Sequence, residues 1–412
     1  MAGVTREVRA SSERLPDRIS LGVLSRTFTD ELLDEVIEAA RARERRYRLL
    51  PARLVLLFVL ACWLFTRSGY PGVMGKLVDA HAVDGPGWDG WTPPTQEAIG
   101  RARARLGPAP LRLLFERVAG ASGTPDTPGA FYRGLRVVTV DGFTLDLRDT
   151  PGNAAHFGRG GNGSVSANPY PQLRALVLAE SGTRSLLGAT YGPCTRGEQA
   201  LAIDLLPALG PGMLLLGDRN FLSWNLWAQV AATGADLCIR ASASFKLTPT
   251  RVLADGTYLA RLAPPRKTGG DPITVRVVEY SITTTSSDGT EDVSEVFALA
   301  TTLLDPAQAP AGDLADLYHL RWQAETGIAD LKTAQRGGPD AVLRSKTPAM
   351  VEQELYAMLC VYQAIRDLIG YAAPSGLDPG RISFKKAIDA ARDTVTRAAL
   401  SPQQPTSKPW PR

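Results

Sequence analysis

The spacing of apolar residues divides the chain into a helical first part, a mixed core and a segment of short strands. In the first part, Thr29 can cap a helix that begins DELLDEVIEAA and continues through RARERRYRLL, and Pro51 opens an apolar helix. A third helix is predicted over PTQEAIGRARARLG. The linker GASGTPDTPGA, residues 120–130, is rich in Gly and Pro and therefore predicts a domain boundary.

The middle of the chain alternates strands and helices. The pattern predicts three strands, a helix, a buried strand and a second helix, at residues 135–147, 172–180, 185–191, 197–209, 213–217 and 223–233. From residue 237 to 304, short alternating runs separated by Pro, Gly, Ser and Asp predict a further β-rich segment. Residues 348–371 predict an amphipathic closing helix, and the tail after Ala372 is expected to be weakly ordered.

Composition favours a globular protein of two or three domains, because 412 residues with 44% hydrophobic residues can bury a large core. A net charge of +4 permits nucleic-acid binding without requiring it. The longest apolar run, Leu54 to Phe65, is shorter than the ~20 residues that span a membrane, and the N-terminus has no apolar signal-peptide core. Four scattered cysteines indicate no disulfide framework, so a reducing cytoplasm is the expected location.

One predicted helix, residues 317–332 (LYHLRWQAETGIADLK), carries the most informative pattern. Offsets of three, seven and fourteen residues fall along one stripe of a helix with 3.6 residues per turn. Here the stripe joins a phenol, two cations and a carboxylate: Tyr318, Arg321, Lys332 and Glu325. Such a face can bind both a metal ion and a phosphate. On this helix alone, an exposed surface with spaced opposite charges remains an open alternative.

Two further carboxylates stand at the ends of predicted strands. Asp141 closes the alternating run RVVTV, and Asp218 follows the apolar run MLLLG. An Asp in such a place caps the next element or serves as a ligand at the carboxyl edge of a sheet. Together with Glu325 these side chains make an all-oxygen site of the kind that suits Mg²⁺ or Mn²⁺. Zinc is disfavoured, because the three His and four Cys show no close pairing.

These motifs resemble a known family. VTVDGF, LLLGDRNF and YHLRWQAETGIADLK, in this order, are similar to the three acidic motifs of DDE transposases of the insertion-sequence-four (IS-four) family. The third motif is specific, whereas each of the first two alone is weak. The interval from Asp218 to Glu325 is too long for one strand and one helix, and the family has a β-rich insertion at that point. The resemblance covers most of the chain, from about Leu15 to Tyr371.

The resemblance implies an α/β fold: an RNase H-like catalytic core, with a mixed sheet and flanking helices, a β-rich insertion and an N-terminal helical domain. The expected division is a DNA-end-binding domain at 1–128, the first part of the core at 129–236, the insertion at 237–312, the completion of the core at 313–372 and a tail at 373–412. The arginines at 41, 43, 45, 46 and 48 form a basic cluster for which a solvated helix end and DNA-end binding both stay open.

The resemblance also implies the chemistry. Asp141 would bridge two divalent ions, Mg²⁺ or Mn²⁺, with Asp218 on one ion and Glu325 on the other. Arg321 and Lys332 would bring DNA phosphates to the metals, and Tyr318 would hydrogen-bond a phosphate. The implied partners are double-stranded DNA, as transposon ends and as target, and a second copy of the chain in a homodimer on DNA. The protein would bind the terminal inverted repeats of an insertion sequence, cut the DNA and transfer its 3′ ends.

Three outer residues are weaker DNA-binding candidates. Arg240 matches a family arginine near DNA, although a salt bridge explains it equally well. Arg219 follows the second Asp and can contact phosphate or pair with an acid. Phe297 stands where some family members stack a flipped base on Trp, but a core Phe explains it too, which puts a hairpin intermediate in doubt. Glu198, which opens a helix, is read as an N-terminal charge rather than a fourth ligand.

Three alternatives to an active transposase remain on the sequence. A domesticated or inactive relative would bind DNA without cutting it, and a host nuclease on the same fold would cut without joining. A glycosidase would explain a pair of carboxylates but not a metal-type triad beside cations.

Overall fold

The computed structural model describes residues 21–46, 48–82, 94–160, 168–242, 245, 247–266, 269–285, 291–293, 296–331, 335, 341–374 and 377–397. The chain divides into two compact units. Unit 1 comprises residues 1–117, 352–361 and 388–412, and unit 2 comprises residues 118–351 and 362–387. The predicted boundary at residues 120–130 therefore lies close to the observed one, but unit 1 also includes segments from the C-terminal part of the chain.

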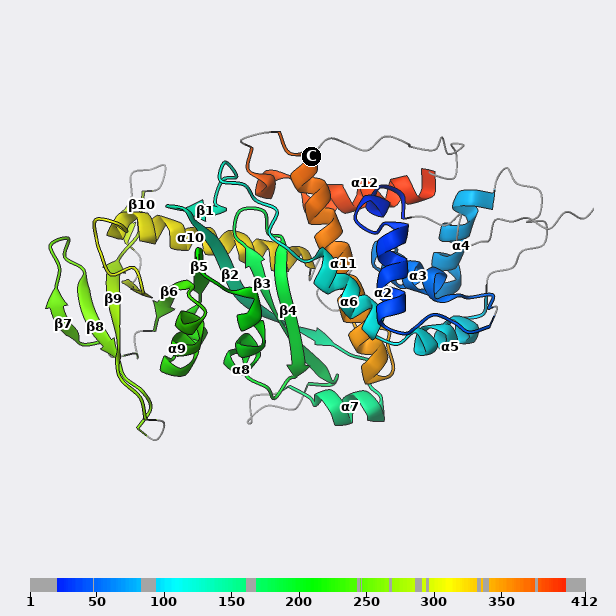
Figure 1. The fold of residues 1–412 in the computed structure, drawn as a ribbon, viewed down its shortest axis with the longest axis horizontal. Helices are drawn as coiled ribbons and strands as arrows, with labels where there is room; N and C mark the ends of the chain where they lie inside the picture. Colours follow the sequence, from blue (N-terminus) through cyan, green and yellow to red (C-terminus); the bar gives the residue numbers. More distant parts are fainter. Residues whose placement is uncertain are drawn as a thin grey trace, which may run out of the picture. The chain divides into compact units, whose positions relative to one another are not determined.

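The described part of unit 1 is helical (Figure 1). It contains η1 (Gly22–Arg26), α2 (Asp30–Ala39), α3 (Ala52–Leu64), α4 (Tyr70–Ala82), α5 (Gln96–Leu106), α6 (Ala109–Val118), part of α11 (Pro348–Ala372) and most of α12 (Phe384–Arg397). Helix α3 is buried along nearly its whole length, as a helix that is apolar all round must be. The indole of Trp63 donates to the carbonyl of Glu354 at 2.8 Å, which joins α3 to α11. None of the described helices combines the length and apolar character needed to cross a membrane.

Helix α2 is shorter than predicted. Its cap is confirmed, since the Thr29 hydroxyl accepts from Leu32 N. The helix ends at Ala39, however, before the basic cluster. Arg41 has a left-handed φ of 53°, and the amide of Ala42 bonds the carbonyl of Ile37 at 2.9 Å. This is a Schellman ending without the glycine that usually announces it in a sequence.

The tail contains order that the sequence prediction missed. Residues Phe384–Arg397 form α12, and four apolar residues spaced four, three and four apart are buried on it: Phe384, Ile388, Ala391 and Val395. The prediction of weak order from residue 373 is therefore wrong for this helix. The end of the predicted tail, residues 398–412, lies outside the described residues.

Unit 2 is built on a sheet that the described residues form with ten strands. The strands are β1 (Phe131–Tyr132), β2 (Leu135–Asp146), β3 (Gln172–Glu180), β4 (Leu186–Pro193), β5 (Met213–Gly217), β6 (Asp236–Ala241), β7 (Pro249–Val252), β8 (Tyr258–Leu262), β9 (Ile273–Tyr280) and β12 (Phe297–Thr301). β10 (Thr283–Thr285) and β11 (Glu291–Val293) form a separate pair. The helices among the described residues of unit 2 are α7 (Pro151–Phe157), α8 (Glu198–Ala202), η2 (Ile203–Ala208), η3 (Arg219–Phe221), α9 (Trp224–Ala232), α10 (Ala311–Asp330) and η5 (Pro379–Arg381), with the remainder of α11.

The first five long strands form an RNase H-like sheet, as predicted. Their spatial order is β4-β3-β2-β5-β6. β3 is antiparallel to β2 and β4, whereas β5 is parallel to both β2 and β6. The single helix predicted over residues 197–209 is instead α8 followed by the tighter η2, which contains Pro207. Proline lacks the amide hydrogen that a continuous α-helix needs.

The β-rich insertion extends the same sheet. β12 pairs with β6, and β9, β8 and β7 follow in antiparallel order. The sequence assigned residues from 237 onward to the insertion, but β6 is a parallel neighbour of β5 and completes the core. The structure thus starts the insertion after Ala241.

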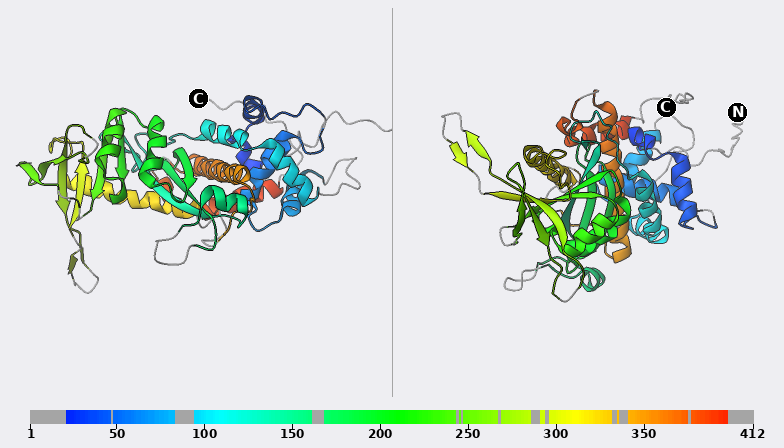
Figure 2. Two further views of the ribbon diagram at one scale, coloured as in Figure 1. Left: turned by 90° about the horizontal axis from the view of Figure 1, so that it is seen from below. Right: turned by 60° about the vertical axis from the view of Figure 1, so that its left-hand side comes forward.

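The two faces of the sheet are covered differently. On one face, residues of α8, η2, η3 and α9 pack against Val138, Val140 and Leu215. On the other, Leu314, Leu317 and Tyr318 of α10 pack against β2, β5, β6, β9 and β12. Figures 1 and 2 show α10 apart from α8 and α9, on the opposite side of the sheet.

Candidate active site

Asp141 lies on β2, and Asp218 directly follows the neighbouring parallel strand β5. β2 pairs with β5 in a register that matches Thr139 with Leu216. Extended by two residues, this register matches Asp141 with Asp218, which directly follows β5. Since neighbouring strands are about 4.8 Å apart, the two carboxylates start from adjacent positions. Asp141 lies inside β2, beyond the alternating run RVVTV, as the predicted strand at residues 135–147 implies.

Both aspartates belong to the face of the sheet that α10 covers. Side chains two residues apart on a strand point to the same face. Val137 of β2 and Leu216 of β5 pack against α10. Asp141 and Asp218 are four and two residues further along, so the alternation turns them to the same side. Both side chains are partly exposed.

Local hydrogen bonds orient the two carboxylates. Asp218 Oδ1 accepts from the amide of Asn220 at 2.8 Å and so caps η3. Asp141 Oδ1 accepts from the amide of Gly142 at 2.8 Å. A carboxylate has about four lone-pair sites, more than a single amide hydrogen occupies. Capping and ligation are therefore compatible at Asp218.

Tyr318 connects α10 to the end of β5. Its side chain is 3% exposed, and its hydroxyl donates to the carbonyl of Gly217, the residue before Asp218, at 3.2 Å. Burial raises the pKa of this phenol well above its usual range, Arg321 lowers it, and the charge of Asp218 raises it further. In this arrangement the phenol holds the helix to the strand rather than a DNA phosphate, contrary to the sequence prediction.

The remainder of the predicted stripe lies further along α10. Arg321 is 6% exposed, and its guanidinium lies over the Tyr318 ring, 5.3 Å from the centroid. The backbone of Glu325 belongs to α10, two helical turns beyond Tyr318. The Glu325 side chain and the whole of Lys332 lie outside what the structure describes.

Arg240 lies next to Asp218, on the strand that follows β5 in the sheet. β5 and β6 pair Gly217 with Ile239, so the next pair in this register is Asp218 with Arg240. The Arg240 guanidinium lies 4.4 Å from the centroid of the Phe297 ring, and Tyr280 stacks on Phe297 with centroids 5.4 Å apart. Arg240 lies within β6.

Phe297 does not offer an open ring to a base. It is 9% exposed, because Tyr280 and Arg240 both cover it. The core alternative of the sequence analysis therefore describes it better than a stacking platform does. Arg219 is exposed at the start of η3, directly after Asp218. A Cβ on Gly142 would come 2.8 Å from Glu198 Oε1. By the same alternation, Glu198 lies on the face of β2 opposite to Asp141 and is not a fourth ligand.

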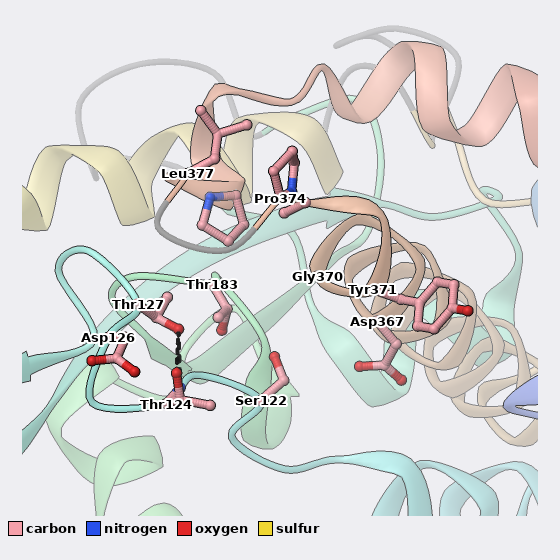
Figure 3. Close-up of a pocket in the computed structure, with 12 residues that line it drawn as sticks. Ser122, Thr124, Asp126, Thr127, Thr183, Asp367, Gly370, Tyr371, Pro374 and Leu377 are labelled. Carbon is pink, nitrogen blue, oxygen red and sulfur yellow. Dashed lines mark hydrogen bonds between the residues drawn. The ribbon is translucent and has the colours of Figure 1, made fainter. Parts of the chain in front are cut away.

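Unit 2 also contains a cavity of about 460 Å³ (Figure 3). Ser122, Thr124 and Thr127, Asp367 and Tyr371 are among its lining residues. None of the lining residues belongs to β2, β5 or α10. The cavity is therefore separate from the candidate site at Asp141 and Asp218.

Comparison with known proteins identifies the family of the chain. Residues 132–364 match the family described as Transposase DDE domain, and residues 18–116 match Insertion element 4 transposase N-terminal. The chain belongs to the DDE transposases of the IS-four family. It is 30% identical over 300 residues to the transposase InsG for insertion sequence element IS4 of Escherichia coli strain K12. That alignment covers 70% of this chain and 65%, less than two thirds, of the relative.

Among solved structures, the fold aligns with a piggyBac transposase synaptic complex with hairpin DNA. The alignment covers 93% of this chain and 82% of the other, at 11% identity and a TM-score of 0.45. That likeness is too distant to inform the site. Membership of the transposase family rests on the family matches, and it removes the glycosidase alternative.

The residues of this transposase fit a divalent ion on chemical grounds. Asp141 and Asp218 provide hard oxygen donors at adjacent positions, which Mg²⁺ and Mn²⁺ prefer. Within the described residues, no three His, Cys, Asp or Glu side chains gather closely enough to hold a metal. The third donor expected in the family, Glu325, is among the side chains that the structure does not describe.

Some residues around the site were missed from the sequence. Tyr280 follows Val278 by two positions, so the alternation of β9 already put both on the α10 face. Burial raises the Tyr280 pKa to about 12. Arg184, Asp330 and Arg366 gave no local signal, because they meet only where the turn between β3 and β4, α10 and α11 pack together.

Proposed function

We propose that this transposase binds the terminal inverted repeats of an insertion sequence, cuts the DNA there and transfers the 3′ ends to target DNA. The observation that supports it most is the adjacency of Asp141 and Asp218 on the face covered by the helix of Glu325. Family membership gives transposase identity. The adjacency adds a place where phosphodiester chemistry can occur.

In this proposal Asp141, Asp218 and Glu325 hold two divalent ions, Mg²⁺ or Mn²⁺. When bound, such ions stabilise the attacking and leaving oxygens of an in-line displacement. Arg240, beside Asp218 in the sheet register, and Arg219, exposed at the start of η3, provide positive charge for the DNA backbone. Arg321 carries its charge on the same helix as Glu325.

The partners in this proposal are double-stranded DNA and a second copy of the chain. Three exposed arginines that follow α2, Arg45, Arg46 and Arg48, offer cations to a DNA end from unit 1. Each end would be gripped by one subunit and cut by the other. The protein would act in the cytoplasm, on the nucleoid when bound to DNA.

The test is a reaction of the purified protein with labelled DNA that carries the sequences flanking its coding region, with Mg²⁺, with Mn²⁺ or with EDTA. We expect cleavage at the element ends and joining of the 3′ ends to a second duplex, only with a divalent ion. A scrambled duplex of equal length is the control.

The two remaining alternatives give different results in this assay. A host nuclease would cut both duplexes without joining products. An inactive relative would shift the end DNA in a gel but leave it intact in every metal. Either result, obtained with folded protein, would overturn the proposal.

A further inference from the structure

Helix α10 approaches α11 very closely at Gly327. A Cβ at this residue would lie 2.9 Å from Tyr362 Oη and 3.2 Å from Arg184 Cδ. Both distances are shorter than ordinary van der Waals contacts, and the Tyr362 ring is fully buried. A larger residue here would require Tyr362, Arg184 or the helix to shift. Gly327 is two residues beyond Glu325 in the same helix.

One turn further on, an ion pair fastens the same helix. Asp330 of α10 accepts from Arg366 Nη2 of α11 at 2.7 Å, and the Arg366 side chain is fully buried. Arg366 Nε donates to Tyr362 Oη at 2.9 Å, and Tyr362 Oη donates to the carbonyl of Arg184 at 3.1 Å. We call Arg184, Gly327, Asp330, Tyr362 and Arg366 the α10 clamp.

Aromatic rings complete the surroundings of Arg366. Its guanidinium lies 5.0 Å from the centroid of the Tyr362 ring and 4.8 Å from that of Phe384. The two rings stack on each other with centroids 5.2 Å apart. Hydrogen bonds and ring contacts therefore hold this arginine in one orientation, which in turn fixes Asp330.

The α10 clamp is not an efficient way to stabilise a fold. Burial and the neighbouring Arg366 lower the pKa of Arg184. Among the described residues, Arg184 Nε and Arg366 Nη1 find no hydrogen-bond partner although both atoms are buried. Arg184 also has a left-handed φ of 63°. Apolar residues of similar size often stabilise such places better than buried ion pairs do, so the clamp calls for a role in geometry.

We propose that the α10 clamp is a positioning device that sets the depth and rotation of α10 and hence the place of Glu325. This rests on the proposed role of Glu325. Tyr318 ties the helix to Gly217 on one side of Glu325, and the clamp ties it to α11 on the other. With the backbone of α10 fixed on both sides of residue 325, the helix would present Glu325 at a defined position along the sheet. Misplacement by about 1 Å can reduce a rate about 100-fold.

The first test compares the same substitution at two glycines of α10. Gly327→Ala adds a Cβ that meets Tyr362 and Arg184, whereas Gly312→Ala adds one with nothing within 4 Å. We expect Gly312→Ala to cut end DNA at the wild-type rate. Gly327→Ala should cut about 10- to 100-fold more slowly at saturating DNA, with end affinity unchanged.

The second test compares two ion pairs with the same donor–acceptor distance. Asp330→Asn breaks the pair with Arg366, and Asp255→Asn breaks the pair with Arg276, also at 2.7 Å and also with a fully buried arginine. Asp255 belongs to the turn between β7 and β8. Both variants should unfold at similar temperatures, but only Asp330→Asn should slow cutting.

Hydrogen exchange gives a readout that is independent of catalysis. Amides of residues 318–330 should exchange faster in Gly327→Ala and Asp330→Asn than in their controls, while amides of β2 and β5 keep their protection. Equal cutting and equal exchange in each matched pair would overturn the clamp. A wild type that fails to cut would refute the proposed function alone, since the exchange comparison still reports whether the clamp holds α10.

Discussion

At the scale of single residues, Tyr318 shows how α10 is held in register with β5. Its phenol bonds the carbonyl of Gly217, and the following residue is Asp218. The stripe on α10 was predicted from spacing, but spacing could not show that the phenol turns into the protein. Burial is a property of the partner surface, here β2, β5 and β6, which the helix sequence does not contain.

Tyr318→Phe is expected to destabilise the protein by about 1 kcal/mol at pH 8, because the carbonyl of Gly217 loses its donor. The folded pKa of Tyr318 is raised, so its contribution is complete below the unfolded pKa of about 10 and falls as the pH rises beyond it. The stability difference between wild type and variant should therefore shrink from pH 9 to 11 in urea denaturation. Tyr371→Phe, at an exposed tyrosine, is the control, and a constant difference would contradict the account.

Asp367, which lines the cavity, is expected to destabilise the folded protein when it is ionised, whereas the Tyr318 hydroxyl stabilises it. Burial raises its pKa to about 6, and the Gln363 side chain, which donates to it at 3.0 Å, lowers it. A raised carboxyl pKa means that stability is lost as the pH rises from about 4 through 6. Asp367→Asn should therefore stabilise the protein by about 1–2 kcal/mol at pH 7.5, after allowance for partial exposure, and by little at pH 4. Thermal unfolding at the two pH values checks this, and an equal effect at both would be inconsistent with it.

At the scale of elements, local patterns predicted most strands and helices, and failures arose where the determining contact was distant or unusual. β2, β3 and β5 closely match their predicted ranges because alternation and apolar runs are strong signals. α2 was predicted too long because Arg41 ends it without a glycine. α12 was missed although Phe384, Ile388 and Val395 have helical spacing, since the polar residues around them dominate the composition.

The buried apolar residues of α12 should be essential for the stability of unit 1. Ile388 is fully buried, so Ile388→Ala is expected to cost about 2–5 kcal/mol through lost burial and a cavity. Lys386→Ala, at an exposed residue of the same helix, should change stability by less than about 0.5 kcal/mol. Guanidinium unfolding measures both. Similar midpoints for the two variants would mean that α12 contributes nothing to the packing of unit 1.

At the scale of the whole molecule, the sequence predicted an RNase H-like sheet through a family resemblance, and the strand order confirms it. Which segments of the chain make up unit 1 was not predictable, because Glu352–Val361 and the segment from Ile388 belong to it although they lie far along the chain. The adjacency of Asp141, Asp218 and Arg240 was equally invisible, since it depends on the registers between strands that are remote in sequence.

Because unit 1 contains segments from both ends of the chain, it limits which variants can test whether one subunit cuts the DNA end that the other subunit grips. Deleting residues 1–128 would remove most of unit 1 while leaving its C-terminal segments, so point variants are preferable. A chain with Arg45→Ala, Arg46→Ala and Arg48→Ala should grip ends poorly, and Asp141→Asn should grip without cutting. Mixed together, they should recover about a quarter or less of wild-type cutting, as random pairing of chains in a DNA-bound dimer allows. No recovery from two folded variants would favour cutting in cis.

The central claim is that Asp141, Asp218 and Glu325 form the site of DNA cleavage. The most direct measurement is single-turnover cutting of end DNA in Mg²⁺ by Asp141→Asn, Asp218→Asn and Glu325→Gln, with Asp146→Asn as the matched control. Asp146 is on the same strand as Asp141, five residues away and so on the opposite face, where it accepts from Gln172. We expect each of these three variants to cut at least about 1000-fold more slowly than the wild type, which corresponds to an increase of over 4 kcal/mol in activation free energy. Their affinity for end DNA, and the cutting rate of Asp146→Asn, should stay near the wild-type values. Near-wild-type cutting by any of the three, or an equal loss in Asp146→Asn, would contradict the assignment.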